Sequence, residues 1–83
     1  MKTTFIRYTP ADRPELKFIL QVETEPDGGY SIQSGCVIEK KKSGTASMEF
    51  TPQILPLILN KLEIEMTDLS LAIEEQLEQK GIL

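Results

Sequence analysis

The chain has 83 residues, of which 40% are hydrophobic and 27% charged, as is typical of one globular domain. Its formal net charge of −4 argues against nucleic acid as a partner, because binding to phosphates needs a positive surface. Histidine is absent and Cys36 is the one cysteine. The commonest general base and metal ligand are therefore missing, and no intramolecular disulfide can form.

We expect a single domain over residues 1–83, with a sheet at about 3–50 and a helical region at about 52–80. A small domain without disulfides is expected in a reducing compartment such as the cytoplasm. No apolar run approaches the roughly 18 residues of a membrane span, and the N-terminal residues lack the apolar stretch of a signal peptide. We therefore expect no contact with a membrane.

Strands are predicted wherever polar and apolar side chains alternate with a period of two. A strand is predicted at about residues 3–8, and alternation does not distinguish its two faces, since the apolar residues Phe5 and Ile6 are adjacent. Three clearer strands follow, and the second of them runs through Gly35 without a change of phase. The expected core-facing residues are Leu16, Phe18, Leu20 and Val22, then Tyr30, Ile32, Ser34, Cys36 and Ile38, then Ala46, Met48 and Phe50.

Parity predicts the two turns between these strands. Directly opposed residues of an antiparallel pair share a face, and the expected core residues are all even-numbered, so each turn must contain an odd number of residues. The triplets at 26–28 and 42–44 fit, and each ends in a glycine suited to positive φ; five-residue turns would also preserve the parity. This register predicts a row of Phe18, Cys36 and Phe50 across the sheet, with Cys36 buried in the core.

The residues after position 50 change to a helical period. Thr51 is suited to cap a helix that starts at Pro52, and Pro56 disturbs its early turns. A second cap at Thr67 or Asp68 and a left-handed stop at Gly81 favour two helices, broken near residues 64–67. One continuous helix remains open, because Leu55, Leu59, Leu62, Met66, Leu69 and Ile73 keep near-heptad spacing. A continuous helix would expose its excess apolar residues and favour a homodimer through this region.

Candidate binding residues fall on three predicted surfaces. The sheet face opposite the core is mostly polar, and Ile19 and Val37 make it partly apolar. A run of lysines lies at the second turn, and acidic residues follow one side of the last helix. A solvated turn and a solvated helix face explain these charges structurally, and attachment to a charged partner explains them functionally. The predicted partner-binding residues are Ile19, Val37, Lys40, Lys41, Lys42, Glu74, Glu75 and Glu78.

The segment "ILQVETEPDGGYSIQSGCVIE" over residues 19–39 resembles the opening of HicB-type antitoxins, which have a strand, a turn of this kind, a second strand and a Gly-Cys pair. The chain lacks the family's proline-rich stretch, its usual helix start and its DNA-binding tail. The resemblance implies a small protein that neutralises another protein. The matching residues are Asp27, Gly28, Gly29, Tyr30, Gly35 and Cys36.

These observations predict an α+β fold: a four-stranded antiparallel β-meander followed by one or two C-terminal helices packed on one sheet face. The expected function is that of a non-enzymatic protein-binding module, such as an inhibitor, an antitoxin-like protein or a phage- or plasmid-type accessory protein, without cofactor or metal. The alternative is a nucleic-acid-binding protein that uses the sheet face and the turn at Lys40, Lys41 and Lys42.

Overall fold

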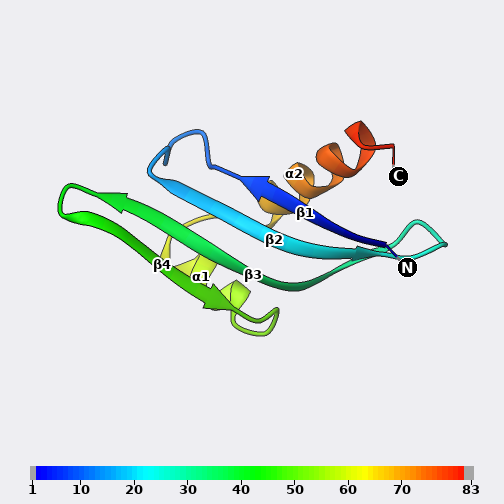
Figure 1. Ribbon diagram of the computed structural model, residues 1–83, viewed down its shortest axis with the longest axis horizontal. Coiled ribbons are helices and arrows are strands. Elements are labelled where there is room, and N and C mark those ends of the chain that lie inside the picture. The colour runs from blue at the N-terminus through cyan, green and yellow to red at the C-terminus, as the bar shows by residue number, and fades with distance from the viewer. Residues whose placement is uncertain (1, 82–83) are drawn as a thin grey trace.

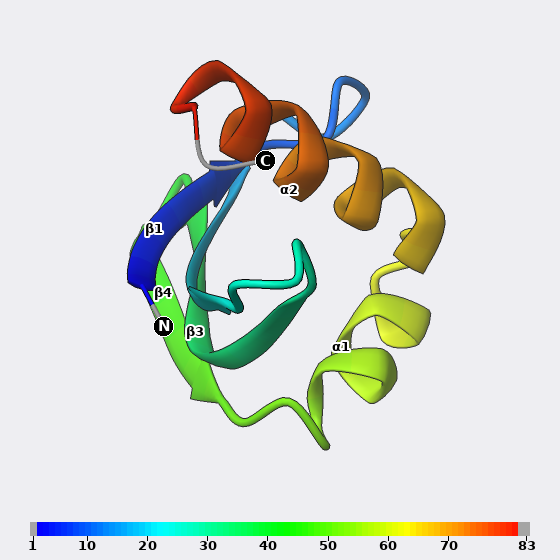
Figure 2. The same ribbon diagram turned by 90° about the vertical axis from the view of Figure 1, so that its right-hand side faces the viewer.

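The computed structural model of the protein describes residues 2–81. Strands β1 (Lys2–Tyr8), β2 (Leu16–Thr24), β3 (Tyr30–Lys41) and β4 (Gly44–Phe50) form one antiparallel sheet in chain order (Figure 1). Helices α1 (Leu55–Lys61) and α2 (Met66–Gln79) follow and lie on the same side of the sheet (Figure 2). The predicted α+β meander is confirmed, with two helices rather than one.

The hydrophobic core lies between the sheet and the two helices. In β1 and β2 the even-numbered side chains point into it, which resolves the phase of β1 that the sequence left open. In α2 the buried residues recur every four positions, so one stripe of the helix faces the sheet. Each fully buried Leu, Ile or Phe side chain contributes about 1.5–3 kcal/mol. The core consists of Ile6, Leu16, Phe18, Leu20, Val22, Val37, Phe50, Leu55, Ile58, Leu59, Leu69, Ile73 and Leu77.

A β-bulge in β3 is the main difference from the predicted sheet. Val22 lies opposite Ile32 as expected, but Gln21 lies opposite Ser34, so Gln33 is an extra residue in β3. After the bulge the faces of β3 are exchanged, because side chains alternate with a period of two. Residues of β3 beyond Gln33 therefore face the core when they are odd-numbered.

The exchange of faces overturns the predicted row of Phe18, Cys36 and Phe50. Phe18 lies opposite Val37, and Val37 is opposite Met48, so these three form a core-side row. Cys36 lies opposite Ile19 on the other face and is half-buried there, so the prediction of a core cysteine is wrong. The physical reason is that the bulge places the bulkier Val37 against the core.

The first turn has the predicted form. The amide of Gly28 donates to the Glu25 carbonyl at 3.0 Å, and the Glu25 amide donates to the Gly29 carbonyl at 2.8 Å. Gly28 has a φ of +92°, a conformation that glycine adopts without steric cost.

The second turn is shorter than predicted. Lys41 pairs with Gly44, so Lys42 and Ser43 alone form the turn. The three-residue prediction is wrong because the bulge changes the parity of β3. Gly44 still has the expected positive φ, at +139°.

The first helix starts later than predicted. The Thr51 carbonyl accepts hydrogen bonds from the amides of Ile54 and Leu55 at 3.1 Å, and α1 then begins at Leu55 with Ile54 as its N-cap. The prediction of a Thr51 cap and a start at Pro52 is therefore wrong. Pro56 lies in the first turn of α1, where an amide hydrogen has no helical partner, so it does not disturb the helix.

The break between the helices is a hydrogen-bonded C-terminal cap. The Ile64 amide donates to the Leu59 carbonyl at 2.9 Å, and the Glu63 amide donates to the Asn60 carbonyl at 3.1 Å. Glu63 has a φ of +59°, so this is a Schellman motif with glutamate at the left-handed position. The predicted break is confirmed, but the N-cap of α2 is Glu65 rather than the predicted threonine or aspartate.

The break between the helices removes the reason for which a dimer through the helical region was predicted. A homodimer through this region was predicted from the apolar residues that one continuous helix would leave without cover, and it stays a prediction. Both helices instead pack on the sheet of their own chain, with Leu55 and Leu59 buried in α1 and Leu69 and Ile73 buried in α2.

Candidate interaction surface

The sheet face opposite the helices carries the candidate site. We call it the outer face, and all four strands contribute to it. Antiparallel pairing aligns its side chains in rows that cross the sheet. Its central residues are Phe5 and Arg7 of β1, Lys17, Ile19 and Gln21 of β2, Ser34, Cys36 and Ile38 of β3, and Ser47 and Glu49 of β4.

Apolar side chains occupy the middle of the outer face. Ile19 lies directly opposite Cys36, and Ile38 follows two residues later on the same face of β3. Phe5 is opposite Gln21, one row away, and 61% of it is exposed. The exposed phenyl ring lies on the same face as these other apolar side chains and extends the apolar patch, and contiguous apolar patches mark interaction sites.

A hollow of about 470 Å³ opens on this surface. Phe5, Ile19 and Cys36 line it, together with Ile54 from the turn before α1. Its polar lining includes Gln21, Ser34 and Glu49, and the Ser34 hydroxyl donates to Oε1 of Gln21 at 3.3 Å. The hollow therefore has an apolar floor and polar groups that can orient a bound side chain.

Charges of both signs surround the apolar centre. Arg7 and Lys17 flank Ile19, while Glu49 lies opposite Cys36 and Glu23 lies opposite Thr3. A mixed rim of this kind suits a protein surface with its own mixed charges, and it does not form the continuous positive stripe that nucleic acid requires.

The structure separates the sequence-predicted residues instead of gathering them. Ile19 lies on the outer face, as predicted. Val37 does not: it is 7% exposed in the core, because the bulge turns it inward, and its assignment to the binding face is wrong.

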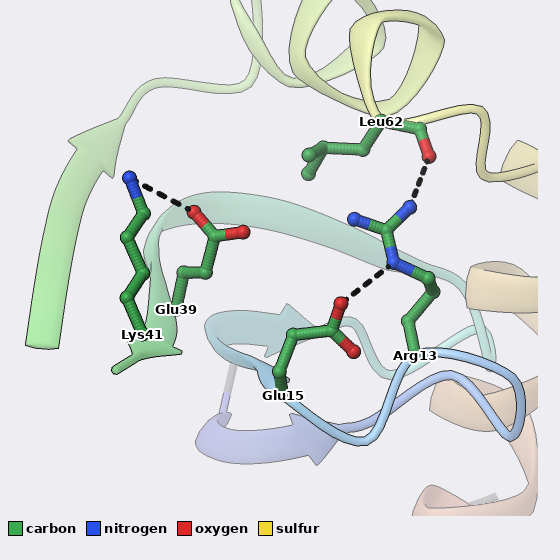
Figure 3. A network of polar contacts seen from close by, with 5 residues as sticks. All are labelled: Arg13, Glu15, Glu39, Lys41 and Leu62. Carbon is green, nitrogen blue, oxygen red and sulfur yellow. Dashed lines mark hydrogen bonds and ion pairs between the residues drawn. The ribbon is translucent and has the colours of Figure 1, made fainter. Parts of the chain in front are cut away.

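The predicted charged residues lie in two further places. Lys40, Lys41 and Lys42 are exposed at the hairpin between β3 and β4, and Nζ of Lys41 is 3.6 Å from Oε1 of Glu39 (Figure 3). The acidic side chains of α2 are exposed on the side of the helix away from its buried stripe. They are Glu74, Glu75 and Glu78.

Sequence reasoning missed five members of the outer face: the apolar Phe5, Cys36 and Ile38, and the polar Arg7 and Ser34. Gly35 was the available signal, because an isolated glycine within a strand often marks a bulge. A bulge before Gly35 exchanges the faces of Cys36 and Val37, and this would have placed Cys36 beside Ile19.

An ion-paired cluster lies away from the outer face. Nε of Arg13 is 3.0 Å from Oε2 of Glu15, and Nη1 of Arg13 donates to the Leu62 carbonyl at 3.2 Å (Figure 3). Hydrogen bonds from the backbone amide of Glu15 and from Arg13 lower the pKa of the Glu15 carboxyl. The same pair raises the pKa of Arg13. The cluster fastens the loop before β2 to the break between the helices, so its role is structural.

Burial, and then the nearby carboxylates of Asp68 and Asp12, raise the pKa of Tyr8. Over residues 2–81, no three His, Cys, Asp or Glu side chains are grouped so that they could hold a metal ion. Neither α1 nor α2 is long and apolar enough to cross a membrane.

Comparisons with known proteins do not assign a family. No protein-family model matches the chain, and neither curated proteins nor solved structures give a match. The functional argument therefore rests on the residues and geometry of this chain.

Proposed function

We propose that this protein is a non-enzymatic protein-binding module whose binding surface is the outer face of the sheet. The observation that carries the proposal is the apolar centre of that face, where Ile19 and Cys36 line the same hollow as the exposed ring of Phe5, and Ile38 follows Cys36 on the same face of β3. Apolar groups gathered on one face and surrounded by charges are typical of protein interfaces, and aromatic residues are enriched in them.

Other features support binding rather than catalysis. The hollow contains no histidine, since the chain has none, and its one thiol lies opposite Ile19 on one strand and Glu49 on the other, without the histidine that commonly activates a thiol nucleophile. A half-buried free cysteine also suits a reducing compartment such as the cytoplasm. The HicB-like segment supplies both the first hairpin and the Gly35-Cys36 pair, which favours an inhibitor or antitoxin-like role.

Partner capture followed by surface variants tests the proposal. The tagged chain is used to isolate a stoichiometric partner, and calorimetry with the purified partner then compares wild type with Phe5→Ser and Ile19→Ser. We expect each change to weaken binding by about tenfold or more, since each removes an apolar contact of about 1.5–3 kcal/mol. Leu71→Ser, at an exposed apolar residue of α2, is the matched control. Binding that is insensitive to both outer-face variants would contradict the proposal.

Nucleic-acid binding is the second candidate. One observation favours it: Phe5 exposes an aromatic ring on the same sheet face as Arg7 and Lys17, and exposed rings can stack on bases. The lysines of the hairpin would contact phosphates. A mobility shift with single-stranded DNA or RNA tests it, and affinity that falls steeply with salt would support it over protein binding.

A further inference from the structure

The two edges of the sheet differ in a way that the proposed function does not explain. At the β1 edge, α2 covers the strand (Figure 1). Oε1 of Gln76 accepts a hydrogen bond from the Arg7 amide at 3.2 Å, and Nε2 of Gln76 donates to the Arg7 carbonyl. Nζ of Lys80 donates to the Phe5 carbonyl at 3.0 Å. Side chains of the helix thus satisfy three outward groups of this edge, which are the amide and carbonyl of Arg7 and the carbonyl of Phe5.

In the part of the chain that the structure describes, no side chain covers the β4 edge in this way. The direction of the backbone groups in β4 can be deduced from β3. The Lys40 amide donates to the Glu15 carbonyl, so the backbone groups of Lys40 point towards β2. The amide and carbonyl groups of successive residues point to opposite sides of a strand, so those of Lys41, Glu39 and Val37 point towards β4 and bond to it. Their partners in β4 are even-numbered, and the amides and carbonyls of the odd-numbered residues point away from the sheet. These residues are Thr45, Ser47 and Glu49.

The outward groups of β4 form an open pairing template. Among residues 2–81, no hydrogen bond is found for the backbone of Thr45, Ser47 or Glu49 on that side. Little of the usual protection of edge strands is present, since residues 45–50 contain no proline and no lysine, Glu49 is their one charged residue, and the β3 pairing of β4 has no bulge.

We propose that β4 pairs with β4 of a second copy, antiparallel and across a two-fold axis at Ser47, to form a continuous eight-stranded sheet. In this register Ser47 meets Ser47 of the partner subunit, and Thr45 of each copy meets Glu49 of the other. All three outward residues are then paired. An axis at Glu49 would place two carboxylates in direct opposition, which is destabilising.

Charge complementarity supports the same register. Within each chain Lys40 lies opposite Thr45 on the outer face. Glu49 of one copy, Thr45 of the other and Lys40 of the other therefore occupy one row. Adjacent strands are about 4.8 Å apart, so Glu49 and Lys40 are about 10 Å apart at the backbone, within reach of two long side chains. The two-fold axis produces this attraction twice.

Side chains of β4 on the helix side of the sheet also support pairing with a second copy. Met48 is 50% exposed and adjoins a groove of about 200 Å³ that Val37, Ile58 and Leu62 also line. With the axis at Ser47, each Met48 lies beside Ala46 of the other copy. Pairing of the strands thus brings each thioether to the mouth of the partner's apolar groove and removes it from water.

The oligomeric state tests the inference independently of partner binding. Sedimentation equilibrium should give a mass near twice 9.4 kDa at micromolar concentration. Ser47→Pro should raise the dimer dissociation constant by about tenfold or more, because it deletes an outward amide without breaking a bond to β3. Ser47→Ala keeps that amide and is the matched control, and circular dichroism checks that both variants fold.

Cross-linking tests the position of the axis. In a Cys36→Ser background, Ser47→Cys places two thiols in an opposed pair with a Cα separation of about 5.5 Å, which suits a disulfide. Oxidation should convert this variant to a covalent dimer and leave a Ser43→Cys variant at the hairpin mainly uncoupled. A monomeric wild type would overturn the proposal, and the β4 edge would then be open for pairing with a strand of another protein. A dimer that is insensitive to Ser47→Pro would also overturn it.

Discussion

The backbone of Gly35 in β3 lies against the ring of Phe50 in β4. A Cβ atom at position 35 would come within 2.8 Å of Cζ of Phe50 and within 2.8 Å of the Ile19 carbonyl oxygen. Both distances are shorter than van der Waals contact allows. The aromatic ring thus occupies the space that a side chain at position 35 would fill, and this packing is possible because the bulge at Gln33 turns position 35 towards the core.

Gly35→Ala should therefore destabilise the fold by about 1–3 kcal/mol, as expected for overpacking against a buried ring and a backbone carbonyl. Urea denaturation measures the change. Gly29→Ala is the control, since a Cβ there meets only Oδ1 of Asp27, at 3.3 Å, on an exposed side chain. Equal losses for the two variants would show that Phe50 does not pack on Gly35.

Glu63→Gly should stabilise the protein by about 1 kcal/mol. Glu63 occupies the left-handed position of the cap between α1 and α2, with a φ of +59°, which costs a residue with a side chain more than it costs glycine. Thermal or urea unfolding checks the sign. The same substitution at Glu74, inside α2, should instead cost about 0.5–1 kcal/mol. A loss of stability at both positions would contradict the left-handed cap.

Gln76→Ala should expose the β1 edge. Gln76 makes two hydrogen bonds to the Arg7 backbone, and each bond contributes about 0.5–1.5 kcal/mol. Hydrogen exchange should become faster at the Arg7 amide and change little at amides in the centre of β3. Gln79→Ala, at an exposed position of the same helix, is the control. Unchanged exchange at Arg7 would show that the glutamine does not cover the edge.

The pair of Arg13 and Glu15 predicts a dependence of stability on pH. The pKa of Glu15 is lowered in the folded state, so its contribution is present above the ordinary glutamate pKa of about 4.3 and is lost as the pH falls through the folded value. Glu15→Gln removes this contribution. Urea denaturation from neutral pH to about pH 3 should show the stability difference between wild type and variant narrowing on acidification. A constant difference would contradict the ion pair.

The positions of the strands and helices follow from the sequence more closely than the register between neighbouring strands does. Period-two alternation identifies the strands, and Gly28 identifies the first turn. The break between two helices is also predicted, although the N-caps are Ile54 and Glu65 and not the residues that the sequence suggested. The bulge at Gln33 was not predictable from alternation, because Cys36, Val37 and Ile38 are all apolar and either phase buries an acceptable face. One undetected extra residue then misplaces Cys36 and Val37 together.

The cover of the β1 edge by Gln76 could not be predicted from the sequence, and the reason differs from that for the bulge. Gln76 resembles its polar neighbours Glu75 and Glu78 in the sequence, and nothing local distinguishes the one that reaches a strand. Only the placement of α2 along β1 gives Gln76 its partner at Arg7. Such contacts depend on tertiary geometry and carry no signal in local periodicity.

Thiol reactivity at positions 36 and 37 tests the central claim, that the bulge turns Cys36 to the outer face and Val37 to the core. Native wild type should react with a small thiol reagent at Cys36, which is half-buried on the outer face. A Val37→Cys variant in a Cys36→Ser background should be protected until it is denatured, since position 37 is 7% exposed. A protected Cys36 and a reactive cysteine at position 37 would contradict the register and the proposed binding surface together.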